Sequence, residues 1–199
     1  QKEIAVNCLP VKSGNSRKYF EYALNLSIKL KRKEYADFIR GITPVIVDLF
    51  EIVLKKQCNI DINAYTYDIG GVRNWDKRKL DGTRLLEVLN KNYKGDFRCG
   101  PVYSDHLRSL IQAYSRDIHL CRLVEDLRQV EANIRNLAAH QIVSITEEKI
   151  EKKTGFTGKQ IMDKIIAIFS YTGMNIGTRS WLSYDEMNRL ILSAMNPVN

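Results

Sequence analysis

Long apolar runs are absent from this sequence. Its 199 residues are 44% hydrophobic and 27% charged, which is the balance of an ordinary globular protein. No apolar stretch approaches the length of about eighteen residues that a membrane-spanning helix needs. These patterns favour a protein that is neither membrane-bound nor secreted.

Cysteine and histidine are also scarce. The four cysteines, Cys8, Cys58, Cys99 and Cys121, are widely spaced and include no C-x-x-C pair, which argues against a zinc site and a disulfide framework. The three histidines form no H-E-x-x-H motif and no pair at ligand spacing. We therefore expect no metal and no other cofactor, and we expect ordinary thiols in a reducing cytoplasm.

Acidic residues are outnumbered by basic ones. The chain has 31 lysines and arginines against 23 aspartates and glutamates, a net charge of +8. Clustered cations bind phosphates and release counterions as they do so. The excess of positive charge therefore favours a polyanionic partner.

Residues 1–15 have no helical period. They contain Pro10, Ser13 and Gly14, a composition typical of a linker or tail, so the predicted domain covers residues 16–199. The chain begins at Gln1 without a charged and then apolar leader. We expect it to be part of a longer polypeptide.

The rest of the chain predicts an all-α helical bundle. Apolar residues recur every three or four positions in several segments, which indicates amphipathic helices. Pro44 is expected to kink the second helix, and Ser183 to cap the last one. The Asp105-His106 pair lies in the first turn of a predicted helix, where an acidic residue is expected, and we assign it no catalytic role. The expected helices cover residues 16–33, 34–56, 83–92, 104–113, about 116–140, 146–155, 157–170 and 183–197.

One long irregular loop, predicted over residues 58–82, interrupts the helices. Its basic aromatic run contains Arg73, Trp75, Lys77, Arg78 and Lys79. Cations interleaved with an indole can hold single-stranded RNA through phosphate contacts and base stacking. A solvated loop with Trp75 packed into the core is the alternative interpretation, and it is the more common arrangement.

The segment from Arg135 to His140 combines groups that suit catalysis of phosphodiester cleavage. A histidine with a pKa of about 6.5 exchanges a proton at neutral pH, and an arginine fork holds two phosphate oxygens as charge builds up on them. Asn136 adds a small carboxamide beside the arginine. Because RNA carries its own nucleophile, the 2′-hydroxyl, an enzyme that cuts it needs only proton transfer and charge stabilisation.

The spacing of these residues limits how they can act together. At roughly 100° per residue, Asn136 and His140 share one face of a helix, whereas Arg135 and His140 diverge by about 140°. Two arrangements remain open. Either the backbone is irregular near Asn136, or a second copy of the chain completes the site across a two-fold axis.

A structural interpretation of the same residues is also open. Arg135 can pair with Glu131, which lies one helical turn earlier. His140 can be a histidine near a helix end, where the dipole favours it.

Arg135, Asn136 and His140 in an all-helical chain resemble the signature of HEPN ribonucleases. In that signature an arginine and a histidine are separated by four to six residues, and a polar residue, often Asn, follows the arginine. The run from Lys31 to Arg40, which leads into the segment from Pro44 to Phe50, also resembles the C-terminal nuclease domain of the Csm-family ancillary ribonuclease of type III-A CRISPR systems. The resemblance covers about residues 16–195.

This resemblance implies a metal-independent endoribonuclease that acts on single-stranded RNA in antiviral defence, as a homodimer with a composite active site. Its catalytic residues would be Arg135, Asn136 and His140. In that family a sensor domain upstream of the nuclease domain binds cyclic oligoadenylate, and the present sequence shows no alternating strand and helix pattern of such a domain. A HEPN toxin of a toxin–antitoxin pair, or an inactive helical module for dimerisation or RNA binding, are the alternatives.

Overall fold

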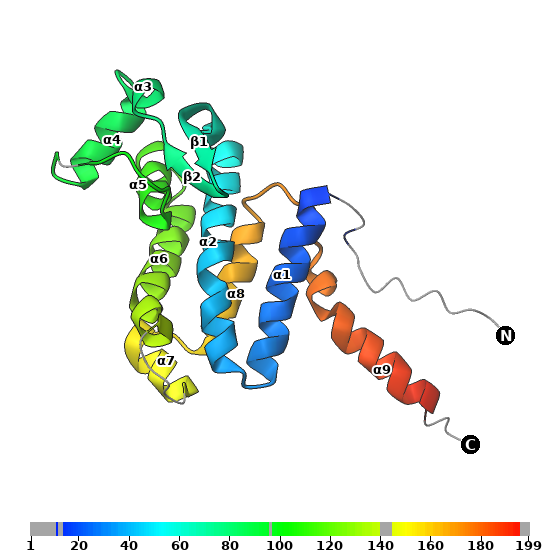
Figure 1. The fold of residues 1–199 in the computed structure, drawn as a ribbon. Helices are drawn as coiled ribbons and strands as arrows, with labels where there is room; N and C mark the ends of the chain where they lie inside the picture. The colour runs from blue at the N-terminus through cyan, green and yellow to red at the C-terminus, as the bar shows by residue number, and fades with distance from the viewer. Residues whose placement is uncertain (1–10, 12–13, 96, 140–144, 196–199) are drawn as a thin grey trace.

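A computed structural model describes residue 11 and residues 14–95, 97–139 and 145–195, with residues 15 and 135–139 described as backbone only. Five helices form the bundle (Figure 1). They are α1 (Gly14–Lys31), α2 (Tyr35–Gln57), α5 (Ser104–Tyr114), α6 (Ile118–Ala139) and α8 (Gly158–Phe169). The predicted all-α bundle is confirmed, with the addition of one small hairpin.

Helix α2 is the centre of the bundle and packs against α1, α5, α6 and α8. It is continuous through Pro44. Its buried residues repeat at helical spacing, and each large apolar side chain removed from water contributes about 1.5–3 kcal/mol. These residues are Phe38, Ile39, Ile42, Val45, Ile46, Leu49, Phe50, Val53 and Leu54.

The close approach of α1 to α2 depends on Gly41. A Cβ atom at this position would lie 2.5 Å from Cδ2 of Leu26, and Leu26 is itself buried. The hydroxyl of Tyr22 on α1 donates a hydrogen bond of 3.0 Å to the carbonyl oxygen of Gly41. A larger residue would therefore require Leu26 or the helices themselves to shift.

The prediction of an irregular loop over residues 58–82 is wrong, because this segment has regular local structure. The segment folds into η1 (Ile62–Tyr65), β1 (Thr66–Ile69), β2 (Val72–Trp75) and α3 (Lys77–Leu80). Gly70 and Gly71 join the two antiparallel strands, with φ angles of 59° and 81°. Two consecutive positive φ angles are the requirement of the tight hairpin turn that glycine favours.

The hairpin is attached to the start of α5. The Trp75 amide donates to the carbonyl oxygen of Gly100 at 2.9 Å, and the Val102 amide donates to that of Arg73 at 2.9 Å. The hairpin, α3 and α4 (Arg84–Asn92) form a head above one end of the bundle (Figure 1). Residues before α5 thus connect the head to the bundle.

Helices α7 (Glu147–Thr154) and α8 begin and end at the positions that their capping residues predict. Helix α7 is capped by Thr146, whose hydroxyl accepts from the Lys149 amide, and ends at Gly155 in the left-handed conformation with φ 78°. Helix α8 begins after Thr157, which forms a capping box with Gln160. These local signals are confirmed.

The last helix differs from the expectation. Ser183 is not an isolated cap but the first residue of α9 (Ser183–Met195), which directly follows the 3-10 turn η2 (Thr178–Leu182). An ion pair of 2.7 Å between Lys31 Nζ and Asp185 Oδ1 ties its start to α1. None of its residues is buried, and Leu190 and Ile191 are 39% and 48% exposed. Helix α9 extends away from the bundle (Figure 1).

Candidate active site

Helix α6 carries the motif and presents one apolar face to the bundle. The buried residues of this face are Leu120, Val124, Leu127, Val130 and Ile134. They confirm the predicted stripe as far as Ile134, and Leu137 belongs to the residues described as backbone only. The core therefore fixes the rotation of α6 immediately before Arg135.

Arg135 and Asn136 lie in the last turn of α6. The helix is regular from Ile118 to Ala139, so the predicted alternative of an irregular backbone near Asn136 is wrong for the described part of the chain. His140 lies outside the described residues. Its position relative to Arg135 stays a prediction.

A buried carboxylate lies one helical turn before the motif. Glu131 has no exposed area, and its Oε2 accepts a hydrogen bond from the hydroxyl of Ser104 at the start of α5. Arg128 Nη1 lies 3.6 Å from the same oxygen. The carboxylate thus belongs to a polar cluster between α5 and α6.

The cluster continues to Asp105, which binds several groups at once. The Tyr93 hydroxyl donates to Asp105 Oδ2 at 2.6 Å, Arg108 Nη2 donates to Oδ1 at 3.0 Å, and Arg128 Nε lies 3.5 Å from Oδ1. Burial raises the pKa of Asp105, but the Tyr93 hydrogen bond and the two guanidinium charges outweigh it, so the pKa lies below its usual value. Asp105 is therefore a charged centre of this cluster and more than a residue that suits the helix dipole.

His106 and Trp75 form a second buried pair. Trp75 is 1% exposed, and its Nε1 donates to His106 Nδ1 at 2.9 Å. The Tyr103 amide donates to the same nitrogen at 3.2 Å. Because Nδ1 accepts, the neutral ring carries its proton on Nε2. Burial lowers the pKa of His106 to about 4; the Asp105 carboxylate opposes this shift, and the Arg128 charge adds to it.

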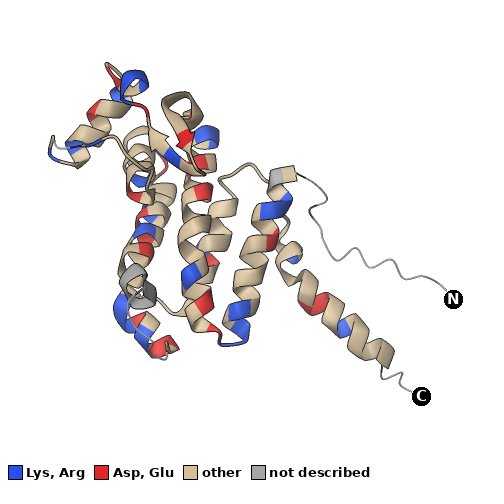
Figure 2. Ribbon diagram, viewed as in Figure 1, with Lys and Arg blue, Asp and Glu red and all other residues tan. Residues whose placement is uncertain are grey.

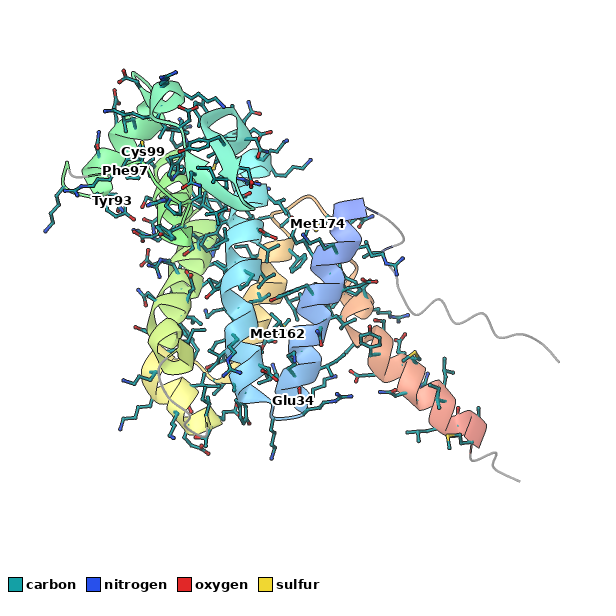
Figure 3. All side chains as sticks on the ribbon, in the orientation of Figure 1. Glu34, Tyr93, Phe97, Cys99, Met162 and Met174 are labelled. Atoms are coloured by element: carbon teal, nitrogen blue, oxygen red, sulfur yellow. The ribbon has the colours of Figure 1, made fainter. Side chains whose placement is uncertain are left out.

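Aromatic rings enclose the His106 imidazole on several sides. The centroids of Tyr93, Phe97 and Tyr103 lie 5.4, 5.3 and 5.4 Å from that of His106. Figure 3 shows Tyr93 and Phe97 close together beside α4. The imidazole is thus part of the packing that holds the head on α5.

The structure separates the predicted RNA-binding residues. Lys77, Arg78 and Lys79 are exposed on α3 at the outer end of the head (Figure 2). Arg73 is half-buried and pairs with Glu51 of α2. Trp75 is buried, so the prediction that its indole stacks on RNA bases is wrong for this conformation, and the alternative of a core tryptophan is confirmed.

Comparison with known proteins shows the family of this sequence. A family model described as the Cas_Csm6 HEPN domain matches residues 8–192. The chain belongs to the Csm6 HEPN domain family. The match covers the bundle, the head and the motif, and it confirms the resemblance drawn from Arg135, Asn136 and His140.

A curated relative supports the same assignment. This Csm6 HEPN domain is 31% identical over 178 residues to a protein named CRISPR system endoribonuclease Csm6 from Mycobacterium tuberculosis (strain ATCC 25618 / H37Rv). The aligned part is 89% of this chain and 39% of the relative. The chain therefore spans about two fifths of the length of that protein.

Sequence reasoning missed the buried cluster of this Csm6 HEPN domain, although one signal was available. Leu127 and Ile134 belong to the apolar stripe, and Glu131 stands between them at stripe spacing. A carboxylate at such a position predicts a buried and partnered charge. Arg128 lies one turn away on the same helix, but Ser104, which donates to the carboxylate, comes from another helix and has no local signal.

Neither a metal centre nor a membrane span is found among the described residues. No group of three or more His, Cys, Asp or Glu side chains there has an arrangement that could hold a metal ion. Within the described helices, none is both long and apolar enough to cross a membrane.

The buried imidazole gives a prediction for stability. Between about pH 6.5 and pH 4 the unfolded chain takes up a proton that folded His106 does not, so stability should fall as the pH falls through this window, by up to about 3 kcal/mol. His106→Gln keeps an acceptor for Trp75 but cannot titrate, so it should lose less stability from pH 7 to pH 5. Urea unfolding at both pH values measures this difference.

The exposed His119 of α6 provides the matched control. His119→Gln should keep the pH dependence of the wild type. Asp48 and Glu51, whose pKa values are raised by burial, titrate equally in all three proteins and cancel in the comparison. Equal losses in His106→Gln and wild type would assign the effect to another group.

Proposed function

We propose that this Csm6 HEPN domain is an endoribonuclease that cleaves single-stranded RNA without a metal ion, in CRISPR antiviral defence. The observation that carries the proposal is the position of Arg135 and Asn136 in the last turn of α6, with His140 four residues after Asn136 in the sequence, in a chain that matches the Csm6 HEPN domain over residues 8–192. The similarity to a protein named as a CRISPR endoribonuclease supports it.

The chemistry follows from the groups that these residues supply. The RNA 2′-hydroxyl loses its proton and attacks the adjacent phosphorus, and the bond from phosphorus to the 5′-oxygen breaks as that oxygen gains a proton. His140 transfers one of these two protons, and Arg135 stabilises the charge that builds up on the phosphate oxygens. Asn136 positions the phosphate or the imidazole. The products are a 2′,3′-cyclic phosphate and a 5′-hydroxyl.

We infer that two copies of the chain build the site. Because α6 is regular through Ala139, continuing the same helical period would direct Arg135 and His140 about 140° apart. A two-fold axis through this end of α6 would instead bring the arginine of one copy toward the histidine of the other. The domain would then act as a homodimer.

We also propose that the exposed cations of α3 assist RNA binding. Lys77, Arg78 and Lys79 lie on one short helix that is held by Asp76, whose carboxylate accepts from the Arg78 amide at 3.0 Å. Cations on a fixed turn can contact successive phosphates without reading sequence. With Trp75 buried, their contribution is electrostatic.

Cleavage should proceed in EDTA and leave 2′,3′-cyclic phosphate and 5′-hydroxyl ends, because the nucleophile belongs to the substrate. RNA with a 2′-deoxy sugar at the cleaved position should be inert. His140→Ala and Arg135→Ala should each lower the rate at least about a hundredfold. End-group analysis of labelled RNA measures products and rates together.

Exposed residues of the same helix provide the controls. His119→Ala and Arg122→Ala should cleave at the wild-type rate, since both lie on the solvent side of α6. Activity that returns only when Mg²⁺ or Mn²⁺ is added would overturn the metal-free mechanism. A wild-type domain that binds RNA but never cuts it would favour the inactive binding module.

Mixed protomers test the composite site. Co-expressed Arg135→Ala and His140→Ala chains should recover activity, because one of the two sites in a mixed dimer then contains an intact arginine and an intact histidine. With random pairing, about a quarter of all sites are active. A mixture as inactive as its two parents would show that each site uses residues of one chain.

Salt dependence tests the contribution of α3. Replacing Lys77, Arg78 and Lys79 by Gln should weaken RNA affinity and reduce the slope of log affinity against log salt by about 2, while the rate at saturating RNA stays nearly unchanged. A charge-matched triple variant of Arg17, Lys18 and Arg40 should keep the slope. Loss of the saturated rate with unchanged affinity would instead assign these three cations to the active site.

A further inference from the structure

Glu131 is a fully buried carboxylate on the apolar face of α6. It stands between Leu127 and Ile134, at a position where the helical spacing requires an apolar side chain. Burying a carboxylate is costly unless charges and hydrogen bonds compensate, and well-packed apolar residues often serve stability equally well. Its presence points to a role in orientation.

The groups around Glu131 form a row of alternating charge, which we call the charge row. Asp105 Oδ1 lies 3.5 Å from Arg128 Nε, and Arg128 Nη1 lies 3.6 Å from Glu131 Oε2. Nε and Nη1 of Arg128 are buried and have no hydrogen-bond partner among the described residues. Through these two nitrogens, Arg128 contacts the two carboxylates at ionic distances of 3.5 and 3.6 Å in the part of the chain that the structure describes.

The α6 residues of the charge row lie on the same side of this helix as Arg135 of the motif. Arg135 is four residues after Glu131 and seven after Arg128 on a regular helix, so the three backbone positions lie on one side of α6. The signs alternate from Asp105 through Arg128 to Glu131, and the next ionisable residue at this spacing is the cation of Arg135. The Ser104 hydroxyl fixes the carboxylate from α5.

We propose that Glu131 is a positioning residue that orients the guanidinium of Arg135 for RNA cleavage, an inference that rests on the proposed function. An arginine side chain has many rotamers, and a fork that must meet two phosphate oxygens gains from being held in advance. Glu131 does not touch the RNA. It acts through Arg135, and the charge row transmits the position of α5 to the motif.

Glu131→Gln is the direct test. Glutamine has the same size and can still accept from Ser104, but it cannot hold a cation by charge. We expect kcat to fall about tenfold to a hundredfold with KM nearly unchanged. The melting temperature should also fall, because Arg128, whose Nε and Nη1 are buried, loses one of its two carboxylates, so kcat is measured well below it. Glu125→Gln is the matched control, because Glu125 lies on the same helix, is partly exposed and pairs with Arg108. This control should keep the wild-type kcat.

A second substitution shows whether Glu131 acts through Arg135. In single-turnover assays with enzyme in excess, Glu131→Gln should slow the Arg135→Lys protein less than twofold, because the fork that it orients is already absent. Equal losses in both backgrounds would show that Glu131 acts independently of Arg135. A wild-type kcat in Glu131→Gln would overturn the proposal.

Two outcomes distinguish the possible failures. If Glu131→Gln does not fold, Ser104→Ala replaces it, since that variant keeps the charge and removes only the donor. It should lower kcat a few-fold, and an unchanged kcat would overturn the positioning role. A wild-type protein without ribonuclease activity would instead refute the proposed function, whatever Glu131 does.

Discussion

The packing of α2 against four other helices is the constraint on which the rest of the structure depends. Because α2 is enclosed by α1, α5, α6 and α8, each of these helices has one rotation that buries its apolar face. For α6 that rotation directs Leu127 and Ile134 inward. Arg135 and Asn136 follow Ile134 directly, so the core sets the orientation of the backbone that carries the motif.

A second consequence of this packing is that segments distant in sequence meet around α5. Trp75 of the hairpin donates a hydrogen bond to His106, and Tyr93 after α4 donates one to Asp105. Arg128 then connects Asp105 to Glu131 on α6. The head is therefore joined to the motif helix by buried polar contacts as well as by chain connectivity. Such contacts add little net stability, but they accept only one geometry.

The helices and their caps could be predicted because their signals are local. Thr146, Gly155 and Thr157 act within one turn of their own helix. The hairpin at Gly70 and Gly71 also had a local signal, two glycines between β-branched and aromatic residues, but the strands are only four residues long. The hydrogen bond from Ser104 to Glu131 joins two different helices, so periodicity predicts the burial of Glu131 but not this partner. The same limit applies to α9, whose apolar spacing does not reveal that it extends from the bundle.

The charge row also bears on how strongly a catalytic arginine can act. A carboxylate that pairs fully with Arg135 would neutralise the charge that the reaction needs, whereas an arginine without a partner would be poorly oriented. Glu131 avoids both extremes if it is shared between two cations, and Arg128 Nη1 lies 3.6 Å from its Oε2. Arg128 is in turn shared with Asp105. Along such a row each anion is divided between two cations, so on the proposed mechanism Arg135 would be held in place and still keep most of its attraction for phosphate.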